Sequence, residues 1–162
     1  MTPVEARPSA TVVLLRESAE GPEVLLLLRS AKLSFHGGEW VFPGGRVDPE
    51  DLDGDDAHGL EAARRAARRE AMEEAGVALE AHELFPIAHW TTPVILPKRF
   101  ATWFLLGRVT DTVVEVDGGE IEDAMWVSPK VALERRDRGE IGLPPPTYVT
   151  LLWLAEHATV GE

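Results

Sequence analysis

Three glutamates at the end of one expected helix are the side chains in this sequence best suited to chemistry. The segment leading to Gly76 is rich in alanine, arginine and glutamate, which favour helix, and this glycine stands where a left-handed cap would end it. Glu73 and Glu74 then fall in the last turn, where the helix macrodipole favours cations. Glu70 lies three and four residues before them, so the three carboxylates share one face and repel each other by roughly a few tenths of a kcal/mol per pair.

Two arrangements would offset this repulsion. In the first, the face is solvated, and Arg68 and Arg69 balance its charge locally. In the second, a divalent cation joins the carboxylates, since Mg²⁺ takes oxygen ligands and is commonly shared between carboxylates and substrate phosphates. The chain has no cysteine, which rules out thiolate ligands and disulfides and favours an oxygen-ligand site.

A glycine-rich strand end lies upstream of the glutamates. Residues 40–47 read Trp-Val-Phe-Pro-Gly-Gly-Arg-Val, a short apolar strand that ends in a proline followed by Gly44 and Gly45. Paired glycines let the backbone approach a ligand closely. Together with residues 69–77, this stretch resembles the Nudix box, G-x5-E-x7-R-E-U-x-E-E-x-G-U, where U is a bulky aliphatic residue. The charged positions of the helical half are all matched, and Ala71 is a smaller residue at the first U.

The box in this sequence contains an insertion. The segment between Gly45 and Arg69 is ten residues longer than in the pattern, and the extra part is an acidic loop from Asp48 to His58. Glu61 lies at the pattern's distance before Arg69, but it would project from the far side of the helix from Glu70 and so stays out of the cluster unless the helix begins after it. The loop itself could add a metal ligand, gate the site or solvate it.

The resemblance implies a hydrolase that cleaves the diphosphate linkage of a nucleoside diphosphate joined to another group, with Mg²⁺ or Mn²⁺ as cofactor. It also implies that Arg69 orients the glutamates through salt bridges and that Glu73 is a candidate general base. A distal base is the alternative, and Glu120 or Glu122 stands in the matching later loop. The implied metal ligands are Glu70, Glu73, Glu74 and the carbonyl oxygen of Gly44.

A second stretch refines the resemblance. Residues 89–93, His-Trp-Thr-Thr-Pro, and the following Lys98 to Phe104 resemble the segment after the box in a branch of the family that includes peroxisomal coenzyme A diphosphatases. Ala101 stands where that branch would have an aspartate. The substrate therefore stays open among coenzyme A and its acyl derivatives, ADP-ribose, dinucleoside polyphosphates and nucleoside triphosphates.

Cations near these motifs are candidates for substrate binding. Arg46 directly follows the glycine pair, and Lys98 and Arg99 begin an expected strand, so all three could contact phosphate. For Lys98 and Arg99 the alternative is a solvated strand start. His36, in the loop before the glycine pair, is either a substrate contact or a surface residue.

Length and charge bound the possibilities. A chain of 162 residues fits a single domain, 1–162, that buries roughly two thirds of its unfolded surface. The net charge of −12 leaves no basic stripe for a nucleic-acid backbone, whereas a small phosphorylated substrate arriving with Mg²⁺ is compatible. No apolar run has the length of a signal-peptide core or a membrane span, so we expect a cytoplasmic protein without a membrane partner. Homodimers are common in the family that the box resembles.

Apolar runs and turn residues predict an α/β/α sandwich with a mixed β-sheet, which is also the Nudix fold. The unbroken apolar run 25–28 is typical of a strand covered on both faces. Ser128 and Pro129 predict a helix start, with an N-cap and a first-turn proline. Besides the short strand within 40–47, the expected strands are 11–16, 24–29, 83–90, 100–109, 113–116 and 124–127. The expected helices are 60–75, 128–137 and one from about 146 that carries His157 near its end.

Two other functions fit parts of this pattern. A Nudix-fold module could sense a nucleotide without turning it over, although a pure binder has no need for three mutually repelling glutamates. Detectable Mg²⁺-dependent product would exclude that module. An acidic protein-interaction domain without a ligand would show no thermal shift with Mg²⁺ and a diphosphate.

Overall fold

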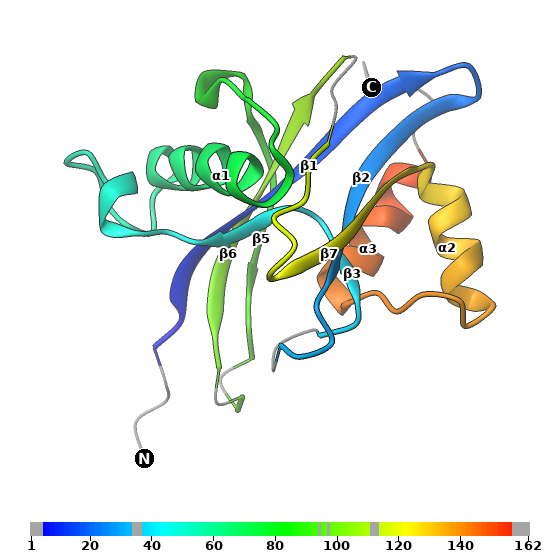
Figure 1. Ribbon diagram of the computed structural model, residues 1–162. Coiled ribbons are helices and arrows are strands. Elements are labelled where there is room, and N and C mark those ends of the chain that lie inside the picture. Colours follow the sequence, from blue (N-terminus) through cyan, green and yellow to red (C-terminus); the bar gives the residue numbers. More distant parts are fainter. Residues whose placement is uncertain (1–4, 34–36, 94, 97, 111–113, 157–162) are drawn as a thin grey trace.

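A mixed β-sheet with helices on both faces forms the structure (Figure 1). The computed structural model describes residues 5–33, 37–93, 95–96, 98–110 and 114–156. The strands are β1 (Arg7–Ser18), β2 (Gly21–Arg29), β3 (Trp40–Val41), β4 (Gly44–Arg46), β5 (Phe85–Thr91), β6 (Phe100–Arg108) and β7 (Ile121–Val127), and the helices are α1 (Leu60–Ala75), α2 (Pro129–Asp137) and α3 (Pro145–Ala155).

The sheet divides where β1 and β2 stop pairing, a place we call the fork. The two strands form an antiparallel hairpin from Ser18 opposite Gly21 to Leu15 opposite Val24. Beyond this point β1 pairs with β4, whereas β2 pairs with β3. The other edge of β1 runs parallel to β6, which in turn pairs with β5, and the other edge of β2 pairs with β7. The chain therefore crosses the fork between β3 and β4, immediately before the glycine pair.

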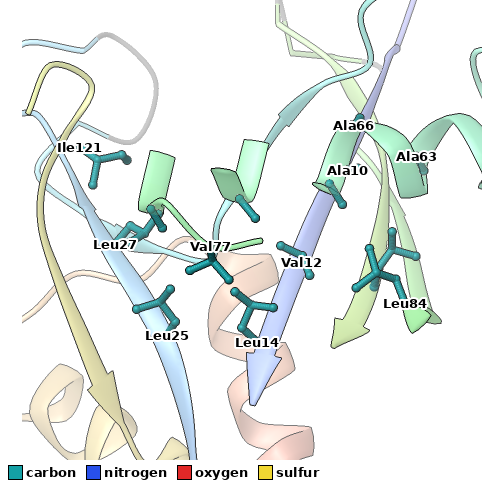
Figure 2. Packing of buried hydrophobic residues seen from close by; sticks show 14 residues of the cluster. Ala10, Val12, Leu14, Leu25, Leu27, Ala63, Ala66, Val77, Leu84 and Ile121 are labelled. Carbon is teal, nitrogen blue, oxygen red and sulfur yellow. The ribbon is translucent and has the colours of Figure 1, made fainter. Parts of the chain in front are cut away.

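Two hydrophobic cores lie on opposite faces of this sheet. Alternate residues of β1 and β2 contribute to each core, so residues 25–27 are fully buried, as their unbroken apolar run predicts. The first core joins the sheet to the alanine face of α1, and in Figure 2 Val77 lies between side chains of β1 and β2. The second core lies beneath α2 and α3. The predicted α/β/α sandwich is confirmed.

Helix positions agree closely with the local sequence signals. Helix α1 has the predicted bounds and ends at Gly76, which adopts the left-handed conformation at φ 67°. Helix α2 begins after Ser128, whose hydroxyl accepts a hydrogen bond from the Val131 N–H. Helix α3 begins one residue before the expected start, and His157 lies outside the described residues. Within the described ranges, no helix combines the length and apolarity needed to cross a bilayer.

The prediction of a strand at 113–116 is wrong for residues 114–116, which the structure describes. Val113 lies outside the described residues, and 114–116 form no strand. The Glu115 N–H instead donates to the Ala75 carbonyl at 2.8 Å. This segment therefore satisfies a carbonyl left open at the end of α1, where the last turn of a helix lacks its own donors.

Candidate active site

The end of α1 meets the glycine pair at the fork. Gly44 lies opposite Thr11 of β1, and a Cβ atom at this position would collide with the Ala10 carbonyl oxygen. The Gly44 N–H donates to the Glu74 carboxylate at 2.8 Å. The Val12 N–H donates to the Pro43 carbonyl, which makes Thr11 and Gly44 a pair without mutual hydrogen bonds. In such a pair both backbone polar groups of Gly44 face away from β1, so its carbonyl oxygen also faces away from β1.

The three glutamates differ sharply in their surroundings. Glu74 is buried, with 4% of its surface exposed. Glu70 lies against Gly45 so closely that an added Cβ would be 2.6 Å from the Glu70 carboxyl carbon. The Glu73 side chain is 56% exposed. The cluster therefore presents one solvent-facing carboxylate beside two that are held against the glycine strand.

Burial makes the inner carboxylates reluctant to ionise. Desolvation raises the pKa of Glu74 to about 8, against the hydrogen bond from Gly44, which lowers it. The negative charges of Glu70 and Glu120 raise this pKa further, and the positive charge of Arg29 lowers it. Desolvation also raises the pKa of Glu70, although the hydrogen bond from Arg69 opposes the shift. Two desolvated carboxylates that repel each other are the kind of donor set that a divalent cation stabilises.

Arg69 connects the glutamates to the acidic loop. One terminal nitrogen contacts both Glu70 at 2.9 Å and Glu73 at 3.1 Å. The Nε and the other terminal nitrogen contact the two carboxylate oxygens of Asp51 at 3.1 and 2.9 Å. That second terminal nitrogen also donates to the Arg46 carbonyl at 3.0 Å. The hydrogen bond to Asp51 is the largest of the effects that raise the pKa of Arg69, so the guanidinium remains charged.

The acidic loop is docked on the protein at several points. Arg65 donates to the carbonyls of Asp51 and Leu52 at 3.1 and 2.8 Å and to the Asp55 carboxylate at 2.8 Å. At the far end of the loop, the Trp103 indole N–H donates to the His58 carbonyl at 3.0 Å. These contacts fix the loop beside α1, where its Asp51 reaches Arg69.

The other candidate site residues differ in their exposure and in their contacts. The Arg46 side chain is exposed at the end of β4, directly after the glycine pair. Lys98 is exposed, whereas the Arg99 Nε donates to the Thr92 carbonyl at 3.1 Å and so stabilises the β5–β6 connection. Glu120 is exposed just before β7, and its charge is among those that raise the pKa of Glu74. Glu122 is not among the main influences on that pKa, so Glu120 is the better placed distal candidate.

Other positions show what sequence reasoning missed. His36 lies outside the described residues. Arg29, at the end of β2, acts on the pKa of Glu74, and only its place two residues after buried Leu27 could have suggested that it faces α1. In the sequence, only the distance of Asp51 from Gly45, which fits G-x5-E, distinguishes it from the other acids of the loop. Glu61 stays out of the cluster as expected, because α1 begins at Leu60 and already includes it.

These residues fit a divalent cation through the chemistry of their donors. In the described part of the chain, no three acidic or imidazole side chains already surround a common point. Arg69 pairs with oxygens of Glu70 and Glu73. A cation would exchange with this guanidinium for the same carboxylates, and the candidate ligands would be Glu70, Glu73, Glu74 and the Gly44 carbonyl.

Comparison with known proteins assigns this fold and site to a family. The model of the NUDIX domain matches residues 5–144, and the chain belongs to the Nudix hydrolase family, whose members act on phosphorus-containing acid anhydrides. The NUDIX hydrolase of Alicyclobacillus acidocaldarius, a solved structure, superposes with a TM-score of 0.84 at 24% identity, over 98% of this chain and 95% of that one.

Two nematode proteins extend this comparison. The peroxisomal coenzyme A diphosphatase ndx-8 of Caenorhabditis elegans is 34% identical over 120 residues, which cover 72% of this chain and 46% of that protein. The structure of the Ap4A hydrolase binary complex from the same organism has a TM-score of 0.58 at 25% identity, over 91% of this chain and 96% of that one. The chain spans 61% and 46% of the length of two curated nematode relatives, so it matches only part of each.

Proposed function

We propose that this protein is a divalent-metal-dependent hydrolase that cleaves the diphosphate linkage of a nucleoside diphosphate joined to another moiety. The observation that carries the proposal is the set of three carboxylates at the end of α1, two of them held against the glycine strand at the fork. Phosphoryl transfer needs positioning and neutralisation of charge more than covalent catalysis. A carboxylate cluster with two desolvated members beside a closely approachable backbone suits that requirement.

The chain's own residues have distinct proposed roles. Glu70, Glu73, Glu74 and the Gly44 carbonyl would hold Mg²⁺ or Mn²⁺, which when bound lowers the pKa of a water and neutralises diphosphate oxygens. Arg69 orients Glu70 and Glu73 through its hydrogen bonds. Glu73 accepts the proton of the attacking water, since it is the glutamate of the three that faces solvent. Arg46 lies on the glycine strand, where its guanidinium can bind a phosphate.

Coenzyme A and its acyl derivatives are the substrates that we propose first. Their support is the 34% identity to a protein named as a coenzyme A diphosphatase. Ala101, where that branch would have an aspartate, is a reason to test other classes with equal care. The position is buried in β6 opposite Pro8. The same site chemistry would serve ADP-ribose, dinucleoside polyphosphates or nucleoside triphosphates.

Product analysis with the purified protein tests this proposal. Coenzyme A, acyl coenzyme A, ADP-ribose, NADH, diadenosine polyphosphates and nucleoside triphosphates are incubated with Mg²⁺ or Mn²⁺, with Glu73→Gln as the control variant. We expect turnover of one class that the substitution reduces strongly. Binding of a diphosphate without turnover by the wild-type protein would favour a nucleotide-sensing module. Neither binding nor turnover across the panel would contradict both functions.

A further inference from the structure

We propose that Asp51 is the positioning residue that holds Arg69 in place for the box glutamates, and that the ten-residue insertion enters the box after Asp51. Its role in catalysis rests on the proposed function, because it acts through residues assigned to metal binding. The contact between Asp51 and Arg69 stands independently of that function.

Asp51 is buried and fully engaged. Only 3% of its surface is exposed, and its two carboxylate oxygens accept hydrogen bonds from two different nitrogens of Arg69. One of these oxygens also accepts the Asp48 N–H at 2.8 Å. Such a two-point contact fixes both the position and the plane of a guanidinium. An aspartate whose oxygens are used in this way serves as a support and not as a further metal ligand.

The spacing of the box leads to the same residue. Counted forward from Gly45, the acidic position of the pattern G-x5-E falls on Asp51, and counted back from Arg69 it falls on Glu61. The structure separates these two candidates. The Glu61 side chain is 57% exposed and pairs with Arg64 at 2.6 Å, whereas Asp51 pairs with Arg69. The extra residues therefore follow Asp51, and the loop that they form is docked by Arg65 and Trp103.

If Arg69 were no longer held by Asp51, its movement would disturb the site through the terminal nitrogen that does not contact Asp51. That nitrogen contacts Glu70 and Glu73, which lie on the same face of α1. Asp48 and Glu50 also lie 3.3 and 3.4 Å from Arg69, but their side chains are exposed and each pairs through a single oxygen. Loss of the two-point contact with Asp51 therefore lets the guanidinium shift towards Glu70 and Glu73, so their carboxylates become less accessible to a cation. Groups that orient metal ligands in this indirect way typically change metal affinity or activity by about 10–100-fold when they are altered.

Asp51→Asn is the decisive variant, and Asp55→Asn is its matched control. Both remove one negative charge from the same loop, but Asp55 pairs with Arg65 and, among the described residues, forms no ion pair with Arg69. The first measurement is the exchange rate of the Arg69 Nε–H by NMR, which reports the contact without any substrate. We expect faster exchange in Asp51→Asn and an unchanged rate in Asp55→Asn.

The second measurement is the Mg²⁺ concentration that gives half-maximal thermal shift and half-maximal activity. We expect it to rise about 10–100-fold in Asp51→Asn and by less than about twofold in Asp55→Asn, with much of the loss restored in Asp51→Glu, which keeps the charge. Equal effects in the two Asn variants, or an unchanged Mg²⁺ dependence in Asp51→Asn with faster Nε–H exchange, would overturn the positioning role. If the wild type turns over no substrate, the proposed function fails, while the exchange rate and the thermal shift still decide the role of Asp51.

Discussion

The carboxylate of Glu74 accepts the N–H of Gly44 at 2.8 Å and thereby joins the last turn of α1 to the first residue of β4. Thirty residues separate these two positions in sequence, and the contact lies at the fork between β1 and β2. The bond places the desolvated carboxylate of Glu74 beside the backbone of the glycine pair. The properties of that acid give the first prediction.

Stability without metal should fall as the pH rises. The pKa of Glu74 in the folded state, about 8, lies above its ordinary value of 4.5, so between these values the folded protein holds a proton that the unfolded chain has lost. Its contribution is complete below pH 4.5 and is lost as pH rises towards 8, by up to about 1.4 kcal/mol per pH unit. Urea unfolding in EDTA from pH 5 to 8.5 measures this slope.

Glu74→Gln supplies the comparison for that slope. The amide is neutral at every pH, so we expect a flatter dependence and a higher stability than wild type near pH 8. Added Mg²⁺ should stabilise the wild type more at high pH, because ligand carboxylates must be deprotonated to bind metal. Parallel pH profiles of the two proteins would contradict the raised pKa.

Gly45→Ala should impair function more than folding. The new methyl group would lie 2.6 Å from the Glu70 carboxylate, which is the far end of a flexible side chain and can move aside. We expect a loss of stability of roughly 1–3 kcal/mol, a weaker Mg²⁺-induced thermal shift and a large fall in turnover. Gly119→Ala is the control, because no atom lies within 4 Å of its added Cβ. Normal Mg²⁺ dependence in the Gly45→Ala variant would show that Glu70 does not need this close contact.

The identity of the general base can be decided by two matched substitutions. We expect Glu73→Gln to lower kcat by about 10²–10⁴-fold, since this carboxylate is solvent-facing and lies beside the other glutamates. Glu120→Gln should lower kcat by less than about tenfold, because the influence of Glu120 on the cluster is the charge that raises the pKa of Glu74. The pH dependence of kcat should lose its acidic limb only in the first variant. The reverse order of the two effects would assign the base to Glu120.

Arg65→Lys should loosen the acidic loop. Lysine cannot reproduce the simultaneous contacts of one guanidinium with two carbonyls and the Asp55 carboxylate. We expect faster hydrogen exchange at the Asp55 and Gly59 amides, which donate within the loop, and a loss of stability of about 1–2 kcal/mol. Unchanged protection of these amides would mean that Arg69 and Trp103 hold the loop without Arg65.

Sequence signals predicted the helices better than the strands. The caps at Gly76 and Ser128 are local features, so they fixed the end of α1 and the start of α2 without knowledge of the rest of the fold. Strand β4 consists of Gly44, Gly45 and Arg46, and a strand with two glycines has no apolar alternation to reveal it. Its pairing with β1 depends on a close approach of two backbones, which only the folded structure shows.

The site was predictable where its residues are neighbours in sequence. Glu70, Glu73 and Glu74 share a helix face, and spacing alone placed them together. Asp51 and Arg29 reach the same region from other elements. Their contributions depend on how the loop docks and on which face of β2 points towards α1. The acidic position of the box was ambiguous for the same reason. Until the contacts of Asp51 and Glu61 are known, the inserted residues can be placed on either side of that position.

The central position of β1 has a consequence for how the protein is made. This strand is synthesised before the other strands of the sheet, but its parallel partner β6 is completed only at Arg108, after α1 and the acidic loop. Pairing between segments so distant in sequence slows folding, because a long intervening chain must be ordered before the contacts form. The apolar β1–β2 hairpin would therefore wait with one long edge exposed on the ribosome, which is where a chaperone would be expected to bind the nascent chain.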